Sequence, residues 1–105
     1  MQKVQVLQSP IHGKGVFARA PITKGSLIGS YEGPVAKRNG TYVLWITDED
    51  GLEYGISGRN KLRYLNHSNR PNAEFDGNQL YARRLIKAGE EITFDYGEDP
   101  ADFDE

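Results

Sequence analysis

The stretch RYLNHSNRPNAEF, residues 63–75, places polar side chains between residues that are typical of a protein core. Its central part, NHSNRPN, contains three asparagines and one of the two histidines of the chain. An asparagine amide both donates and accepts hydrogen bonds, and so does a neutral imidazole. Asn66 and His67 therefore fit two interpretations. They either close a turn as satisfied core groups, or they bind a polar ligand such as an amino acid or the edge of a purine.

The composition of the chain limits the classes of protein to which it can belong. Its 105 residues predict one compact domain, and 12 glycines with 5 prolines favour many turns over long helices. Cysteine is absent, which excludes disulfides and thiolate metal sites, and no loop has the DxDxDG calcium pattern, so we expect no metal. No apolar run approaches the length of a membrane span, and no signal-peptide core is present. We therefore expect a soluble intracellular protein.

The charge of the chain is distributed unevenly, although its net value is only −2. Residues 98–105, EDPADFDE, contain five acidic residues and no basic one, so residues 1–97 carry a net charge of +3. The acidic segment is either a solvated, frayed tail or a lip that attracts a basic substrate. We accordingly divide the chain into a domain at 1–97 and an acidic tail at 98–105.

Short strands separated by turns account for most of the pattern, which predicts a mainly β fold. Alternation in KVQVLQS and the β-branched, aromatic run TYVLWIT predict strands at 3–9 and 41–47. Hairpins are expected around DEDG, residues 48–51, and around DG, residues 76–77. RNKLRYL, residues 59–65, predicts one or two helical turns. Three further strands are predicted in GVFARA, SLIGSY and EITFDYG.

Two segments of the chain echo each other. PITKGSLIGSYEG, residues 21–33, and LIKAGEEITFDYG, residues 85–97, share the order isoleucine, turn, glycine, strand, tyrosine, glycine. The tyrosine falls one position later in the second segment. Because two turn-and-strand units can converge on such a pattern, we attribute the echo to local turn chemistry.

Gly13, Lys14 and Gly15 form a glycine motif that matches no phosphate-binding loop. A Walker A loop requires GxxxxGK[ST], and a dinucleotide fingerprint requires a third glycine and a helix, whereas a strand is predicted to follow here. The motif is either a turn between strands or a place where the backbone approaches a ligand closely, which glycine permits.

Three tyrosines lie in or at the end of predicted strands, namely Tyr31, Tyr42 and Tyr96. Each of them alone fits the core or the rim of a pocket. A phenol on an apolar ring also suits the wall of a narrow slot that has one polar end.

Four motifs in this order resemble the SET-domain protein lysine methyltransferases. GKGVFA is similar to the glycine motif of that family, and SYEG to its Tyr-x-Gly strand end. RYLNHSNRPN resembles its most diagnostic segment, and EITFDYG its C-terminal tyrosine motif. The four motifs together span residues 13–97. The resemblance implies a SET-domain, β-clip-like fold of several short sheets, in which the C-terminal segment threads under an earlier loop as a pseudoknot.

The resemblance also implies an activity, namely methyl transfer from S-adenosylmethionine to a lysine amine of a basic protein or peptide, with histones among the candidate substrates. Tyr96 matches the catalytic tyrosine that would orient the amine, and Tyr31 would line the lysine channel. The cofactor would be held by Lys14, Gly15 and Val16, mainly through backbone groups, and by Tyr42, Arg63, Asn66 and His67.

Several features depart from the pattern of the family. Asn69 stands where the family commonly has cysteine, the cysteine-rich flanks are absent, and the stretch between Gly33 and Arg63 is short. Some other group must then cover the site. Phe103, an aromatic residue among acids, is our candidate lid, and a partner subunit in a homodimer is the alternative.

A second hypothesis from another class stays open. The domain would be a catalytically silent module that keeps the fold and binds a basic peptide. Under either hypothesis we expect no membrane and no direct nucleic-acid partner. The compartment is expected to be the cytoplasm in a bacterium, and the nucleus or a host cell if the target is host chromatin.

Overall fold

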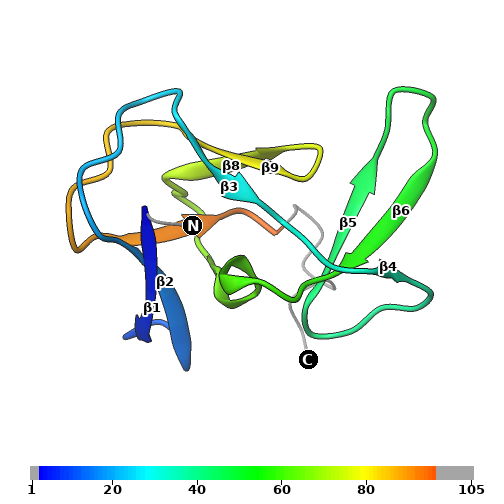
Figure 1. Cartoon of the computed structure of the whole chain (residues 1–105), viewed down its shortest axis with the longest axis horizontal. Helices are drawn as coiled ribbons and strands as arrows, with labels where there is room; N and C mark the ends of the chain where they lie inside the picture. The colour runs from blue at the N-terminus through cyan, green and yellow to red at the C-terminus, as the bar shows by residue number, and fades with distance from the viewer. Residues whose placement is uncertain (1–2, 97–105) are drawn as a thin grey trace.

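The computed structural model describes residues 3–96 and has three small sheets and one short 3-10 helix (Figure 1). The predicted mainly β fold is therefore confirmed. The first sheet contains, in spatial order, β1 (Val4–Gln8), β2 (Lys14–Ala18), β10 (Glu91–Phe94) and β7 (Asn66–His67). The second contains β3 (Leu27–Ser30), β9 (Gln79–Ala82) and β8 (Ala73–Asp76). The third contains β4 (Val35–Ala36), β6 (Glu53–Ser57) and β5 (Val43–Thr47), and the helix is η1 (Lys61–Tyr64).

The expected strands and hairpins lie where alternation and turn residues placed them. β5 and β6 pair antiparallel, and so do β8 and β9. The Oδ1 atom of Asp48 accepts the backbone N–H groups of Asp50 and Leu52, both at 2.9 Å, and thereby closes the first hairpin. The helical prediction at 59–65 corresponds to η1 alone. β4 and β7 were not predicted, because two residues are too few for any periodicity to show.

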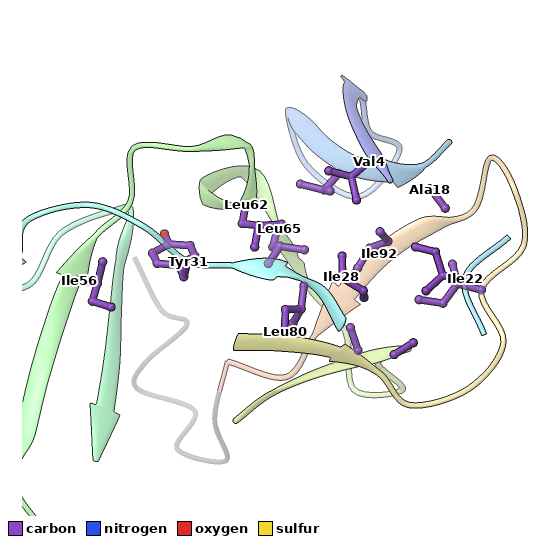
Figure 2. Close-up of a cluster of buried hydrophobic side chains, with 14 of the residues drawn as sticks. Val4, Ala18, Ile22, Ile28, Tyr31, Ile56, Leu62, Leu65, Leu80 and Ile92 are labelled. Carbon is purple, nitrogen blue, oxygen red and sulfur yellow. The ribbon is translucent and has the colours of Figure 1, made fainter. Parts of the chain in front are cut away.

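One hydrophobic core joins the three sheets (Figure 2). Leu62 of η1 is fully buried and packs in this core together with Leu80 of β9 and Ile92 of β10. Figure 2 shows Tyr31 and Ile56 at one end of the cluster and Val4 and Ala18 toward the other. The short elements are therefore stabilised by their shared core, since strands of two to five residues have little stability of their own.

β10 lies at the centre of the first sheet and connects distant parts of the chain. It pairs antiparallel with β2, where Ile92 faces Val16. It also pairs parallel with β7, where Thr93 faces Asn66 and Phe94 faces His67. The segment NHS and the segment FDY thus lie side by side, which is the juxtaposition that the expected pseudoknot requires.

The side-chain amide of Asn72 stabilises this arrangement, because it bonds to the backbone of β10 as a neighbouring strand would. Its Nδ2 atom donates to the backbone oxygen of Glu91 at 2.8 Å, and its Oδ1 atom accepts the backbone N–H of Thr93 at 2.9 Å. Asn72 is almost fully buried, so both bonds satisfy groups that water does not reach. One of the asparagines in the opening stretch therefore has a structural role.

The two echoing segments pair with each other, so local turn chemistry alone does not account for the echo. The backbone groups of Ile22 and Ile86 exchange two hydrogen bonds of 2.8 Å. Gly25 and Gly89 occupy equivalent turns, with φ values of +84° and +82°. The same relation continues in two further bonds of 2.8 Å, from Gly25 N–H to the Ala82 oxygen and from Gly89 N–H to the Ala18 oxygen. The two turns form a quasi-symmetric pair.

Candidate active site

Asn66 lies at the beginning of β7 and is nearly buried. Its Nδ2 atom is within hydrogen-bond distance of three oxygens, those of the His12 backbone (3.2 Å), the Lys14 backbone (3.1 Å) and the Glu91 carboxylate (2.9 Å). Carbonyl and carboxylate oxygens accept hydrogen bonds, so the amide must present its NH₂ group to them. The Oδ1 atom of Asn66 therefore faces the other way, and it accepts no hydrogen bond from residues 3–96.

His67 follows directly and holds the backbone beside Tyr96. Its Nδ1 atom accepts the Tyr96 backbone N–H at 3.0 Å, which requires Nδ1 to be unprotonated. The proton then lies on Nε2 and is donated to the Oδ1 atom of Asn69 at 3.0 Å. In this tautomer the approach of 3.7 Å between Nδ1 and the Asp95 carboxylate is not an ion pair. Asn69, at the position where the resemblance leads one to expect cysteine, accepts the Nε2 proton of the tautomer that the Tyr96 N–H selects.

The hydroxyl group of Tyr96 contacts the residue that directly precedes Asn66 in the sequence. It donates to the backbone oxygen of Leu65 at 2.7 Å, and Leu65 precedes Asn66. The side chain is half exposed, yet partial burial of the phenol raises the pKa of Tyr96 above its usual range. Tyr96 therefore reaches from the surface to the segment that carries the buried amide.

The Tyr96 side chain is also part of the lining of an aromatic groove of about 270 Å³. Phe75 and Phe94 line it with ring centroids 5.0 Å apart, and the Phe94 and Tyr96 centroids are 4.8 Å apart. Trp45 of β5 lies on the same lining. Two carboxylates, those of Glu74 and Asp95, also line the groove, while its one basic residue, Arg83, pairs with Glu74 at 3.3 Å. The groove thus combines apolar walls with acidic groups.

A cluster of cations and phenols forms next to η1. The guanidinium of Arg63 lies 4.7 Å from the Tyr64 ring centroid and 5.9 Å from that of Tyr42, and the Lys14 ammonium lies 5.5 Å from the Tyr64 centroid. Arg63 also donates to the Tyr64 hydroxyl at 2.7 Å, which lowers the pKa of Tyr64. Three predicted cofactor residues, Lys14, Tyr42 and Arg63, are thus brought together.

An open cavity of about 510 Å³ continues from Arg63 and Tyr64 along η1 toward Asn60. Sequence reasoning missed Tyr64, although its place beside Arg63 in the diagnostic segment was an available signal.

Tyr31 packs against the ring of Phe75, which in turn lines the groove. It is 6% exposed, its hydroxyl donates to the Tyr42 backbone oxygen at 2.6 Å, and its ring meets Phe75 edge-on at 5.9 Å between centroids. Burial, with a further contribution from Tyr96, raises the pKa of Tyr31 to about 12. Tyr31 supports two residues of the site, and its predicted place in the wall of the lysine channel stays a prediction.

The remaining predicted residues have different positions. Val16 is fully buried in the core, so it has no exposed side chain to offer a ligand. A Cβ at Gly15 would collide with the Glu91 carboxylate, so the absence of a side chain there leaves room for this carboxylate. Phe103 lies outside the described residues. Between residues 3 and 96, no three His, Asp or Glu side chains gather as a metal site, and no helix is long and apolar enough to cross a membrane.

This fold and this site define a class of protein: a small β domain in which an asparagine–histidine segment pairs in parallel with a strand that leads to a tyrosine. The sequence profile of the SET domain family matches residues 13–97. The chain belongs to the SET domain family, whose members typically use S-adenosylmethionine.

Comparison with known proteins agrees with this assignment. The chain is 31% identical to the human Histone-lysine N-methyltransferase 2B and 30% identical to the Arabidopsis thaliana Histone-lysine N-methyltransferase MEDEA, in each case over 90% of the chain. It covers only 4% and 17% of the lengths of these relatives. The crystal structure of the methyltransferase domain of human SETMAR is similar over 89% of this chain and 44% of that one, with a TM-score of 0.77 and 25% identity.

Proposed function

We propose that the protein is a protein-lysine N-methyltransferase that uses S-adenosylmethionine. One observation carries this proposal. The hydroxyl of Tyr96 bonds to the Leu65 oxygen, beside Asn66, while the ring of Tyr96 lines the aromatic groove. A single side chain thus connects a groove suited to an alkyl amine with the segment suited to a polar cofactor.

The residues beside η1 fit the chemical groups of S-adenosylmethionine. This cofactor supplies a methyl group bonded to a positively charged sulfur. The Lys14 ammonium and the Arg63 guanidinium match its carboxylate, and the Oδ1 atom of Asn66 matches its amino group. The rings of Tyr42 and Tyr64 offer π faces that suit a purine or a cationic sulfur.

The aromatic groove fits a lysine side chain. The Asp95 carboxylate on its lining attracts a basic peptide, whereas the charge of Glu74 is offset by Arg83. The attacking amine must be neutral, and for a free lysine at pH 7 the neutral form costs ~4.6 kcal/mol, since its pKa is about 10.4. The apolar walls of Phe75, Phe94 and Trp45 reduce this cost, because burial disfavours the charged amine.

Tyr96 acts in this proposal as a positioned acceptor. Its raised pKa keeps the phenol protonated at neutral pH, so it is a poor base. Its proton is directed to the Leu65 oxygen, and a phenol oxygen that donates one hydrogen bond is also able to accept one from an N–H of the amine. The main contribution to rate is then alignment of the amine with the methyl group.

The experiment is isothermal titration with S-adenosylmethionine, followed by incubation with labelled cofactor and a panel of histones and other basic proteins. Mass spectrometry then locates the methylated lysine. Absence of cofactor binding would contradict the enzyme proposal, while binding without transfer to any protein would favour the silent module. Because the two relatives named above are histone-lysine methyltransferases, histones are the first substrates to try.

Tyr96→Phe provides the sharper test of the proposed role. We expect turnover to fall by about 10²-fold, because the amine loses its acceptor, while cofactor affinity stays within a few-fold. Tyr81→Phe is the matched control, since it removes an exposed hydroxyl that bonds only to Gln79 at 2.9 Å on β9. Equal loss of turnover and cofactor affinity in Tyr96→Phe would make Tyr96 a structural residue.

A further inference from the structure

Glu91 forms a polar contact that the proposed function does not use. It begins β10, and its carboxylate lies against the segment that connects β1 and β2. The Ser9 hydroxyl lies 2.8 Å from its Oε1 atom and 2.9 Å from its Oε2 atom, and Asn66 Nδ2 lies 2.9 Å from Oε2. The described part of the chain contains no ion pair that involves Glu91. Its partners are thus one hydroxyl and one amide.

The loop around this carboxylate is shaped to receive it. Ser9 is fixed by two bonds, one from its own N–H to the Gly13 oxygen at 2.7 Å and one from the Ile11 N–H to its hydroxyl oxygen at 2.9 Å. Gly15 leaves the space that the carboxylate occupies, because a Cβ there would collide with Oε2 of Glu91. The glycine motif and the start of β10 are therefore complementary in shape.

The orientation of the Asn66 amide depends on these acceptors. If the amide were rotated by 180°, its oxygen would face the Glu91 carboxylate and the backbone oxygens of His12 and Lys14. That arrangement would oppose acceptors to an acceptor, with one of them charged, and would leave the NH₂ group without these bonds. The carboxylate makes the largest contribution because a hydrogen bond to a charged acceptor is about twice as strong as a neutral one.

We propose that Glu91, held by Ser9, is a positioning residue that fixes the Asn66 amide with Oδ1 directed toward the cofactor site. The site thereby selects a ligand that carries a donor, namely the amino group of the cofactor. Glu91 does not touch the reacting atoms, and it acts only through Asn66. This inference rests on the proposed function for the identity of the ligand, whereas the orientation of the amide is independent of it.

The first test needs no cofactor. NMR of ¹⁵N-labelled protein follows the side-chain NH₂ group of Asn66 and its exchange with water. We expect slow exchange in the unmodified protein and in Glu91→Gln, whose amide oxygen still accepts the bond, and exchange at least about tenfold faster in Glu91→Ala. Unchanged exchange in Glu91→Ala would overturn the proposal, whether or not the protein binds S-adenosylmethionine.

The second test measures which ligand group senses Glu91. Isothermal titration compares S-adenosylhomocysteine with its deaminated analogue, in which hydrogen replaces the amino group. In Glu91→Ala we expect affinity for S-adenosylhomocysteine to fall by about tenfold or more, and affinity for the analogue to change by less than about threefold. Equal losses for both ligands would mean that Glu91 only supports the loop, and this result would overturn the proposal.

Two variants keep the result interpretable. Ser9→Ala removes only the hydroxyl that holds the carboxylate, and it should produce a smaller loss with the same ligand preference. Glu90→Gln is the matched control, because this neighbouring carboxylate bonds to Arg84 at 2.6 Å and to the Lys87 N–H at 3.0 Å, with no bond to Asn66. Glu90→Gln should leave both affinities unchanged, and a ligand preference there would overturn the proposal.

If the unmodified protein bound neither ligand, the proposed function would fail, and the exchange measurement alone would decide the role of Glu91.

Discussion

The two quasi-symmetric units differ in what their tyrosines do. Ile28 of the first unit and Ile92 of the second are both buried and occupy equivalent places in β3 and β10. Tyr31 follows Ile28 by three residues, whereas Tyr96 follows Ile92 by four. A shift of one residue in extended chain turns a side chain to the opposite face. Tyr31 is accordingly 6% exposed in the core, and Tyr96 is 46% exposed in the groove.

Both phenols nevertheless make the same kind of bond. Tyr31 donates to the Tyr42 backbone oxygen at 2.6 Å, and Tyr96 donates to the Leu65 backbone oxygen at 2.7 Å. The surroundings distinguish them. Gly58 packs so closely on Tyr31 that a Cβ there would collide with the phenol oxygen, whereas the Tyr96 ring faces a groove. Equivalent turns thus place one tyrosine in the core and the other on the lining of the groove.

Truncation of the two tyrosines should produce the largest contrast. We expect Tyr31→Ala to lower the free energy of unfolding by about 3–5 kcal/mol, because it leaves a cavity in the core. Tyr96→Ala should cost less than half as much, since nearly half of the side chain is exposed. Urea unfolding followed by circular dichroism measures both values. Equal losses would contradict the division of roles.

Local features of the fold could be predicted from the sequence, and their long-range pairing could not. Alternation and turn residues predicted the strands and both hairpins, because these depend on neighbours in the chain. The parallel pairing of β7 with β10 joins residues 27 positions apart, from Asn66 to Thr93, and a two-residue strand carries no periodic signal. Only the family resemblance anticipated that juxtaposition.

The candidate site could be predicted only in part from residue types. The asparagine–histidine segment was selected because polar groups in a core-like context are unusual, whereas Tyr96 alone fitted the core or the rim of a pocket and its role came from the family resemblance. Phe75, Phe94 and Trp45 looked like ordinary strand residues, and only the tertiary structure turns them toward one groove. Glu91 resembled any surface acid of a strand, and its contact with Asn66 depends on the path of the loop that contains Gly15.

Alkaline titration should test the buried state of Tyr31, and we expect a change in stability of intermediate size. The pKa of Tyr31 is raised to about 12 by burial, whereas an unfolded tyrosine has a pKa of about 10. Its contribution to stability is complete below pH 10 and is lost as pH rises toward 12, because the unfolded chain releases a proton that the folded chain retains. Tyr31→Phe should therefore lose less stability than the unmodified protein between pH 9 and about pH 11. Urea unfolding at the two pH values measures this difference, and identical losses would argue against a buried, protonated Tyr31.

Gly25 and Gly89 allow a test of the symmetry itself, with the smallest expected effect. Both have φ near +80° and neither has an atom that a Cβ would meet within 4 Å, so Gly→Ala at each position introduces backbone strain without a clash. Each substitution should cost about 1–2 kcal/mol, and the two costs should agree within about 0.5 kcal/mol. Gly40→Ala is the control, because Gly40 does not have a positive φ and the nearest atom to a Cβ there would be at an ordinary 3.7 Å. Alanine at this position should therefore be neutral or slightly stabilising.

Equal costs at the two turns, measured by urea unfolding, would show that the two turns are energetically equivalent and that the units differ only in the strands that follow them. The difference between Tyr31 and Tyr96 would then arise from the one-residue shift alone, whereas clearly unequal costs would locate part of it in the turns.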